Sequence, residues 1–424
     1  MISRLLSRAP AIDRELRKLY LRLTFPNRRE RGFTYWTDAR TQLQTVWEWA
    51  GATPEPGKLF FGYYDKSPWS PDGASMLMHF RRNSSDREIE ICVFHRRSRS
   101  RQFVGRTRAW NFQQGAMSQW IVGRDRPLII YNDVRNDLLV SRVVTAEGKE
   151  IAVVPMPVQT VHPDGSIALG LNYKRLLKLR KEYGYTPRVK NFSADMPLDK
   201  DGIWRADLTS GQFKLVLSLA ELIQISPQPG MNTQRNKVNH IIFSPGGTRC
   251  VFMHRWFHAN SKYSRLYVMN SSTLAFNLIL DSGLISHYHW YDDEKLIVYG
   301  NTPDGETGYF ELNVVTGRYQ TFAKAALDPY GDGHPSVSPD KAWIVTDSYP
   351  DHRFQQHLLL YHLGRGQSVE AGRFLHSPQY YGVTRCDLHP RWSRDGQYLS
   401  FDSVWNGTRQ SYILDVSRIV RDGL

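Results

Sequence analysis

Cysteine is scarce in this sequence of 424 residues, which contains Cys92, Cys250 and Cys386 and no others. An odd, sparse set of cysteines is not a disulfide framework of the kind found in small secreted domains. Long apolar runs are also missing. No stretch of about 18 apolar residues could span a membrane, and the N-terminal residues lack the apolar run of a signal peptide. We therefore expect a cytoplasmic protein whose contact with a membrane, if it has one, is peripheral.

Several catalytic motifs are absent as well. The sequence has no Gly-x-Ser-x-Gly, no Gly-x-x-x-x-Gly-Lys-Ser/Thr, no Cys-x-x-Cys and no His-Glu-x-x-His. These absences argue against a peptidase and an NTPase. No nucleic-acid-binding module can be identified beyond the positive charge, so a nucleic-acid partner is not expected.

What the sequence does have is positive charge, with a formal net value of +14. Such a field attracts polyanions, for which acidic polysaccharides and anionic membranes are candidates. Residues 1–31 contribute +6 of this charge, and their apolar residues recur at helical spacing. We predict a basic amphipathic helical extension over residues 1–35. It either packs on the rest of the protein or gives residues 1–31 a peripheral contact with an anionic membrane.

A degenerate repeat of about 47 residues runs through the remainder of the chain. Each copy has an alternating strand, a turn rich in Ser, Pro, Asp and Gly, and a second apolar strand. The clearest turns are Ser70-Pro71-Asp72-Gly73, Ser244-Pro245-Gly246-Gly247, Ser338-Pro339-Asp340-Lys341 and Ser393-Arg394-Asp395-Gly396. This unit has the size of a four-stranded propeller blade. We predict an all-β protein, a seven-bladed β-propeller over residues 36–424.

One step of the repeat, from residue 162 to residue 244, is almost twice as long as the others. Residues 172–200 within it are basic and aromatic and do not alternate like a strand. We favour an insertion at about 172–200 in a ring of seven blades, with eight blades as the alternative. Long irregular insertions in a compact fold are often functional.

Histidines recur at one position of the repeat. His240, His287, His334 and His389 each lie four residues before the aligned serine position of four consecutive blades. In a propeller, equivalent positions at the start of the innermost strands surround the central axis, so these imidazoles should converge. Histidine binds metals and transfers protons near neutral pH. A metal-binding or catalytic cluster is one reading, and histidines that cap loops through backbone hydrogen bonds are the other.

Two further groups are candidates for contact with an acidic sugar. The insertion and its flank supply Tyr173, Arg175, Tyr183, Tyr185 and Arg188. Arginine pairs with carboxylates, and tyrosine stacks on sugar rings and transfers protons. A basic surface helix anchored by aromatic residues would explain the same pattern. Gln114 and Asn132 lie at the ends of blade strands and form a second, weaker group.

The segments around the four histidines resemble the oligogalacturonate lyases, which are seven-bladed propeller polysaccharide lyases. The resemblance covers about residues 235–415 and is carried by Val238-Asn-His-Ile-Ile-Phe-Ser-Pro, Ser286-His-Tyr-His-Trp290, Gly333-His-Pro-Ser-Val-Ser-Pro-Asp340 and Leu388-His-Pro-Arg-Trp-Ser-Arg-Asp-Gly396. Much of the turn pattern is shared with TolB-like propellers, and the architecture is also similar to that of ulvan lyases.

The resemblance implies roles for particular residues. His240 or His254 resembles the catalytic base, and Arg235 resembles the catalytic arginine. His287, His334 and His389 resemble the ligands of a divalent metal, Mn or Zn, although no residue matches the glutamine ligand of that family. In ulvan-lyase-like propellers the chemistry uses a tyrosine and an arginine, for which Tyr173 and Arg188 are the local candidates.

The sequence therefore predicts a carbohydrate-active propeller that cleaves a uronate-containing oligo- or polysaccharide by β-elimination. Such a reaction removes a weakly acidic proton beside a carboxylate, so it needs a cation or a metal, a base and an acid. Histidine, arginine and tyrosine supply all three. The alternative is a non-catalytic TolB-like propeller that binds a protein or a glycan.

Overall fold

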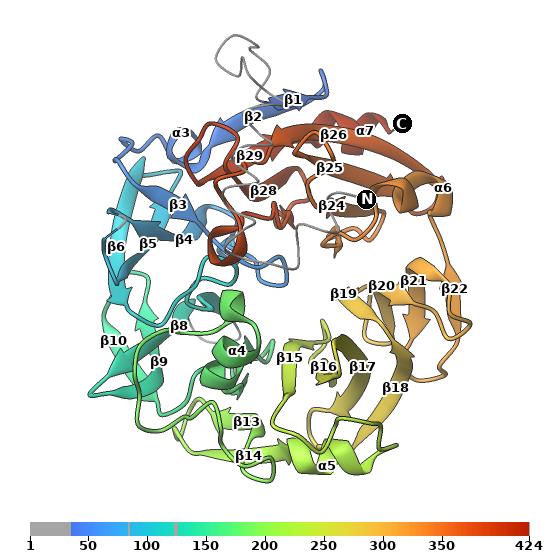
Figure 1. The fold of residues 1–424 in the computed structure, drawn as a ribbon. Helices are drawn as coiled ribbons and strands as arrows, with labels where there is room; N and C mark the ends of the chain where they lie inside the picture. Colours follow the sequence, from blue (N-terminus) through green and yellow to red (C-terminus); the bar gives the residue numbers. More distant parts are fainter. Residues whose placement is uncertain (1–34, 84, 123–125, 424) are drawn as a thin grey trace.

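The chain folds into a ring of antiparallel sheets (Figure 1). A computed structural model describes residues 35–83, 85–122 and 126–423. The predicted N-terminal basic helix lies outside these residues. The ring consists of seven sheets, so the prediction of a seven-bladed all-β propeller is confirmed. We number the blades 1 to 7 in chain order from β3.

The first three blades follow one another along the chain. Blade 1 comprises β3 (Lys58–Phe60), β4 (Ser75–Arg81), β5 (Ile89–His95) and β6 (Ser100–Thr107). Blade 2 comprises β7 (Gln119–Ile121), β8 (Leu128–Arg135), β9 (Leu138–Thr145) and β10 (Glu150–Val154). Blade 3 comprises β11 (Thr160–Val161), β12 (Ile167–Gly170), β13 (Gly202–Asp207) and β14 (Phe213–Ser218).

The next two blades have the same strand order. Blade 4 comprises β15 (Asn236–Phe243), β16 (Arg249–His258), β17 (Ser261–Asn270) and β18 (Phe276–Gly283). Blade 5 comprises β19 (Ile285–Trp290), β20 (Lys295–Asn301), β21 (Thr307–Asn313) and β22 (Tyr319–Thr321).

The last two blades recruit strands from the beginning of the described chain. Blade 6 joins β23 (Ser336–Val337), β24 (Trp343–Asp347), β25 (Gln355–His362) and β26 (Gln367–Leu375) to β1 (Tyr35–Thr37). Blade 7 joins β27 (Arg391–Trp392), β28 (Tyr398–Ser403) and β29 (Gln410–Asp415) to β2 (Gln42–Thr45). Because β2 pairs with β29, the two ends of the propeller are held in one sheet and the ring is closed.

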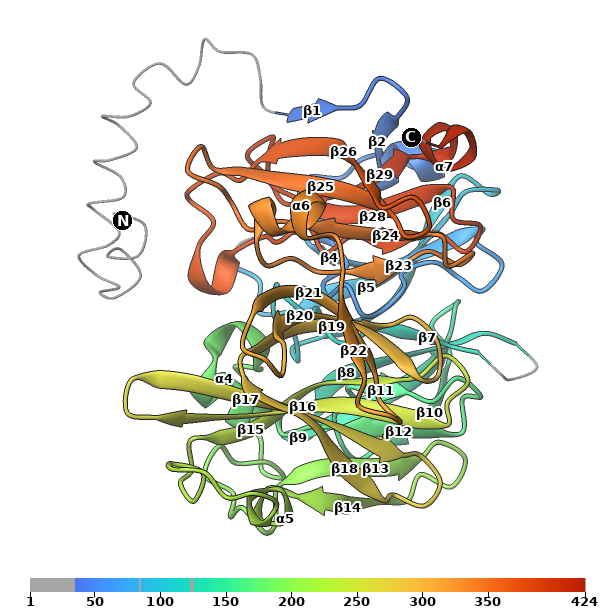
Figure 2. The same cartoon turned by 90° about the vertical axis from the view of Figure 1, so that its right-hand side faces the viewer.

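Short helices connect the blades or cover their edges. They are α3 (Val46–Ala50), α4 (Tyr173–Leu179), η1 (Lys181–Tyr183), α5 (Leu219–Gln224), α6 (Lys324–Leu327), η2 (Asp328–Tyr330), η3 (Gly382–Thr384) and α7 (Ser417–Asp422). The segment between β12 and β13 carries α4 and η1, and it accounts for the long step in the repeat. Figure 2 shows α4 and the β16–β17 hairpin projecting from the same side of the ring. No helix in the described part of the chain is both long and apolar enough to cross a membrane.

The turn of the repeat is built by its own side chains. In blade 7 the Ser393 hydroxyl donates to Asp395 and accepts the amide of Tyr398 at 2.9 Å, while Gly396 has a φ of 70°. Blade 1 repeats this arrangement with Ser70 and Gly73. Short polar side chains that bond to the backbone, with a glycine at positive φ, fix a tight reversal. These turns set the register of each innermost hairpin.

Tryptophans join neighbouring blades at one repeat position. The indole Nε1 of Trp392 donates to the carbonyl oxygen of Ser336 at 3.0 Å, and that of Trp290 donates to Ile242 at 3.1 Å. Trp120 makes the equivalent bond to Pro68 at 2.9 Å. In each case the acceptor lies two residues before the aligned serine of the preceding blade. A large buried ring with one satisfied polar atom therefore holds consecutive innermost strands together at the centre.

Candidate functional site

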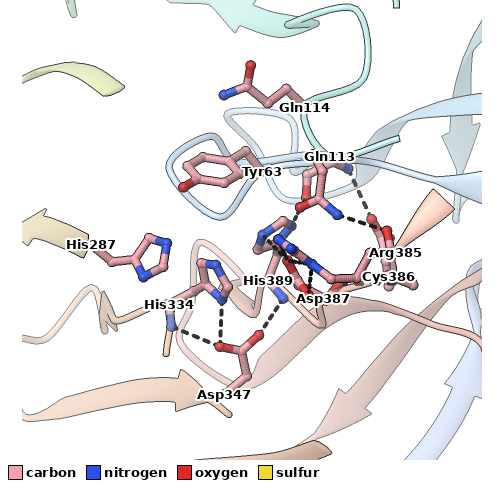
Figure 3. Close-up of polar contacts among 12 residues, drawn as sticks. Tyr63, Gln113, Gln114, His287, His334, Asp347, Arg385, Cys386, Asp387 and His389 are labelled. Atoms are coloured by element: carbon pink, nitrogen blue, oxygen red, sulfur yellow. Dashed lines mark hydrogen bonds and ion pairs between the residues drawn. The ribbon is translucent and has the colours of Figure 1, made fainter. Parts of the chain in front are cut away.

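Four histidines from four consecutive blades lie close together, and Figure 3 shows three of them, His287, His334 and His389. Ring centroids are 6.4 Å apart for His240 and His287, 4.1 Å for His287 and His334, and 4.3 Å for His334 and His389. All four side chains are buried. The convergence predicted from the repeat position is therefore observed, and we call these residues the histidine cluster.

Backbone conformation helps to aim two of these rings. His240 has a φ of 56° and His389 a φ of 49°, a left-handed conformation that is uncommon for residues other than glycine. His240 also lies where the pairing of β15 with β16 shifts register, between Asn239 and Ile242. Strained backbone of this kind persists where the surrounding structure holds it, and it is frequent at functional sites.

Asp347, at the end of β24, positions two members of the cluster. Its Oδ1 accepts the backbone amide of His334 at 2.8 Å and contacts the Nδ1 of the same residue at 2.8 Å. Its Oδ2 accepts the backbone amide of His389 at 2.9 Å. One buried carboxylate thus fixes the loops that precede β23 and β27 relative to each other.

Each of the last three histidines has its Nδ1 atom bound by an acceptor. His287 Nδ1 contacts Asp332 at 2.8 Å, His334 Nδ1 contacts Asp347, and His389 Nδ1 donates to the carbonyl oxygen of Gly62 at 2.9 Å. The Nε2 atoms of His334 and His389 are buried without a hydrogen-bond partner among the described residues. A histidine ligand of a metal is held in this way, with Nδ1 oriented by an acceptor and Nε2 free.

A carboxylate completes a potential metal site. His334, Asp387 and His389 each offer one ligand atom, and these atoms lie within 4.8 Å of one another. Two imidazoles and a carboxylate suit Mn or Zn. His287 lies against His334 and could add a third imidazole. The orphaned Nε2 atoms and the donor set therefore fit a divalent metal.

Neighbouring charges shift the pKa values of the residues at this potential metal site in different directions. Burial favours the neutral acid at Asp387, but the Arg385 guanidinium, which approaches it at 2.7 Å, holds the pKa of Asp387 well below its usual range. Burial, with the nearby charge of His334, lowers the pKa of His389 well below its ordinary value. Burial also opposes charge on His334, yet Asp347 raises its pKa. Asp387 is thus held charged beside a neutral His389, which is the ligand form of each of these two residues.

Tyr63 lies between His240 and the other histidines. Its ring stacks on His240 with centroids 4.9 Å apart, and its hydroxyl is 3.2 Å from His240 Nε2. It also makes an edge contact with His389 at 4.8 Å. Burial raises the pKa of the Tyr63 hydroxyl well above its ordinary value, so the phenol keeps its proton. His240 Nδ1 is buried and without a partner in the part of the chain that the structure describes.

Positive charges without acidic partners adjoin His240. Lys237 and Arg255 are paired across β15 and β16, and both are about 2% exposed or less. Lys237 Nζ has no hydrogen-bond partner within the described ranges. Burial, together with the charges of Arg255 and Arg180, lowers the pKa of Lys237 well below its ordinary value. We call Lys237, Arg255 and Arg180 the cationic group.

Carboxylates are missing from the immediate surroundings of this group. No ion pair joins any of these three side chains to a carboxylate among the residues the structure describes, and Glu182 raises the pKa of Lys237 less than burial and the neighbouring cations lower it. Both side-chain polar atoms of the neighbouring Asn239 are also buried and unpartnered there. Buried polar groups and charges are normally paired, so this blade face is arranged for an anionic ligand.

Two other residues named from the sequence stand apart from the histidine cluster. His254 Nε2 is bonded to Asn236 at 2.9 Å, and the ring stacks on Trp256. Burial lowers the pKa of His254 to about 3. Arg235 is exposed, with its guanidinium over Phe257 at 5.4 Å. Of the two candidate bases, His240 is therefore the one beside the other histidines.

The insertion divides into a packed part and a part that reaches the cluster. Tyr173 stacks on Tyr185 with centroids 4.2 Å apart, and Arg175 pairs with Asp201 at 2.5 Å. The side-chain amide of Asn132 is hydrogen-bonded to Tyr185, to Ser141 and to the backbone of Val158. These buried contacts attach the insertion to blades 2 and 3, and they leave little free for a ligand.

Tyr183 and Arg180 form the part that reaches the cluster. The Tyr183 ring contacts His240 at 5.6 Å and Tyr63 at 5.9 Å, and the Arg180 guanidinium lies over Tyr183 at 4.3 Å. The backbone of Gln114 packs against Gly62, next to Tyr63, and the Gln114 Oε1 atom is buried without a partner in the described structure. Arg188 is exposed and makes no contact with the cluster that the structure records.

The sequence analysis missed several residues of the site. Asp332, Asp347, Asp387 and Lys237 lie outside the repeated histidine position, and Tyr63 has no counterpart in the other blades. A partial signal was available for Asp387, because Asp-x-His is a spacing that places two ligands on one short segment. Nothing in the local sequence distinguished Lys237 from a surface lysine.

Comparisons with known proteins agree with the architecture. No family model and no curated protein matches the sequence. Among solved structures, the fold is similar to an oligogalacturonate lyase in complex with manganese, with a TM-score of 0.62 and 15% identity over 90% of this chain and 95% of that one. It is also similar to an oligogalacturonate lyase from Vibrio parahaemolyticus, with a TM-score of 0.60 and 14% identity over 90% and 96% of the chains. At this identity the likeness establishes the seven-bladed fold.

Proposed function

We propose that this protein cleaves an acidic, uronate-containing glycan by β-elimination with the help of a divalent metal. One observation carries the proposal: three histidines whose Nδ1 atoms are anchored by acceptors lie next to His240, and His240 adjoins buried basic side chains that have no carboxylate partner among the described residues. The likeness in fold to oligogalacturonate lyases supports the choice of substrate class.

The metal would be held by His334, Asp387 and His389, with His287 adjacent. A bound divalent ion would supply positive charge that stabilises the negative charge developing on the substrate carboxylate. The protein's own contribution is orientation. Asp347, Asp332 and the Gly62 carbonyl hold the imidazoles, and Arg385 keeps Asp387 ionised.

The cationic group would bind the substrate carboxylate or a neighbouring one. A carbon acid next to a carboxylate is very weak, and neutralising the carboxylate strengthens it. Arg255 is buried, where charge interactions are stronger than in water. Lys237, whose pKa burial lowers, would be protonated more readily once an anionic carboxylate is bound beside it.

His240 would accept the C5 proton, and Tyr63 would donate to the leaving oxygen. In the tautomer whose Nε2–H donates to Tyr63, the unpartnered Nδ1 carries a lone pair that can take this proton. The C5–H electrons form the C4–C5 double bond, and the C4–O4 bond breaks. O4 leaves with a proton from the Tyr63 hydroxyl, which burial keeps protonated.

The test is ultraviolet absorbance of the unsaturated uronate, recorded with Mn²⁺ or Zn²⁺ present. Oligomers of galacturonate, glucuronate, mannuronate and guluronate form the panel. We expect absorbance to rise on at least one acidic glycan and on no neutral one. Binding without any absorbance across the panel would reject the lyase and leave a non-catalytic glycan-binding propeller.

A further inference from the structure

A second feature on the same side of the ring is a basic groove of 1240 Å³ between the insertion and the loops of blades 1 and 2. Six basic and three acidic side chains line it. Arg87 and Arg108 come from the blade 1 side, and Lys181 and Arg188 come from the insertion. We call this the basic groove; it lies outside the histidine cluster.

These four cations are free to meet a ligand. All four are exposed, and no side-chain hydrogen bond or ion pair engages them in the described parts of the chain. Other basic residues of the lining are engaged: Lys178 pairs with Asp195, and Arg81 lies over Trp110 at 5.1 Å. Charges of one sign converging from two separate segments make a surface for an extended anion.

Aromatic rings form one wall of the groove. Trp110 and Phe112 lie edge to face with centroids 5.1 Å apart, and Trp110 Nε1 donates to the carbonyl oxygen of Arg87 at 2.9 Å. The indole is therefore fixed while part of it stays accessible. Fixed aromatic rings beside cations suit a chain of acidic sugars, whose rings have apolar faces and whose carboxylates carry charge.

Three segments that line the groove continue in sequence into residues that surround the histidine cluster. Lys181, Glu182 and Gly184 line it and flank Tyr183, which contacts His240. Phe112 lines it and directly precedes Gln113, whose side chain donates to the Arg385 carbonyl oxygen at 2.8 Å. Thr384 lines it and directly precedes Arg385, the partner of Asp387. The groove and the proposed reaction centre are therefore built in part from the same three segments of chain.

We propose that the basic groove binds the units of an acidic glycan that extend beyond the histidine cluster, so that affinity increases with chain length. The identity of the ligand as a glycan rests on the proposed function. The evidence for the groove itself is its volume, its four cations without partners in the described structure, and the three segments that it shares with the surroundings of the cluster.

Calorimetry with size-fractionated uronate oligosaccharides tests this inference. The full chain carrying His240→Ala serves as parent, so that ligands are not consumed, and galacturonate and alginate oligomers of about two to eight units serve as probes. Removing two exposed charges through Arg108→Gln and Arg188→Gln should weaken octamer binding about fivefold and leave dimer binding unchanged. It should also reduce the salt dependence of octamer binding. Lys214→Gln with Arg318→Gln is the matched control, since both side chains are exposed and neither lines the groove.

The outcomes separate the groove from the lyase. Equal affinity for dimer and octamer, an equal loss in the control variant, or an RNA of the same charge bound as tightly would overturn the groove proposal. A failure of both the galacturonate and the alginate oligomers to bind would also overturn it. Binding that depends on length and on Arg108 and Arg188, in a wild-type protein that cleaves nothing, would keep the groove and reject the lyase. Cleavage by a protein whose affinity does not depend on the length of the oligosaccharide would keep the lyase and reject the groove proposal.

Discussion

The two halves of the site are built at the same repeat positions but have opposite surroundings. His334 and His389 are held by the carboxylate of Asp347 and lie beside that of Asp387. His240 instead adjoins Lys237 and Arg255, and it has no carboxylate partner in the described structure. Equivalent imidazoles are thus placed in two different settings. We call His334, His389 and their two carboxylates the acidic half, and His240 with Lys237 and Arg255 the cationic half.

The difference shows how one repeat can supply two chemical functions. In the acidic half the carboxylates orient imidazoles and add a ligand, which suits a cation. In the cationic half the charges are left without internal compensation, which suits an anion. Tyr63 contacts both halves, so a substrate that touches it would lie between the proposed metal site and the cationic group.

The largest expected effect that distinguishes the cationic half from the acidic half is the loss of activity in His240→Ala. Losing the base should reduce kcat by about a thousandfold, while one divalent ion is still bound, because the acidic half is untouched. Absorbance kinetics and elemental analysis measure the two quantities. His352→Ala is the control, since His352 is exposed. Loss of metal together with activity would contradict the division.

Asp347→Asn should weaken the acidic half. The amide keeps the shape of the side chain but offers one acceptor oxygen in place of two, and three bonds to His334 and His389 depend on these oxygens. Metal affinity should fall by about 10- to 100-fold, as measured by competition with a chelating dye. Binding of a uronate oligomer in the absence of metal should not change. An unchanged metal affinity would show that Asp347 does not position the ligands.

Lys237→Met should weaken the cationic half and stabilise the fold. Removing a buried group that has no partner should raise the free energy of unfolding by about 1 kcal/mol or more, while uronate affinity falls by about tenfold. Urea unfolding and calorimetry measure these changes. Arg235→Met is the comparison, because Arg235 is exposed and remote from the cluster. A less stable protein with unchanged affinity would assign Lys237 a structural role.

Histidines packed within the blades provide a smaller contrast with the cluster. Burial lowers the pKa of His79 to about 4, that of His254 to about 3 and that of His376 to about 4. The unfolded chain protonates these residues near pH 6.5 and the folded chain does not. Their contribution to stability is therefore complete above pH 6.5 and is lost as the pH falls toward 4.

The expected loss is on the order of 1 kcal/mol per histidine for each pH unit below 6.5. Thermal melts between pH 7.5 and pH 5 measure it. In His79→Gln the dependence on pH should be shallower than in the parent. If melting temperature depends on pH with the same slope in both proteins, then burial does not lower the pKa of His79, whose Nε2 contacts Ser118 and Ala116.

The fold was largely predictable because its signals are local and repeated. Turn residues such as Ser393, Asp395 and Gly396 act within one hairpin, so seven blades could be counted from spacing. The convergence of the four histidines followed from rotational symmetry. Pairing of β2 with β29 joins distant parts of the chain and left no local pattern.

The remainder of the site depends on contacts between blades. Asp347 reaches His389 in the next blade, and Gly62 of blade 1 accepts from the same residue. Lys237 became notable only through its burial, which sequence does not report. Arg175 and Tyr173 looked suited to a ligand, but packing of the insertion buries them in contacts with neighbouring blades.

Elemental analysis of the purified protein, repeated on His287→Ala/His389→Ala, tests most directly whether the acidic half is a metal centre. After exposure to Mn²⁺ or Zn²⁺ and dialysis, the parent should retain about one ion per chain and the double variant almost none. A parent that retains no ion, or a double variant that retains as much as the parent, would contradict the account.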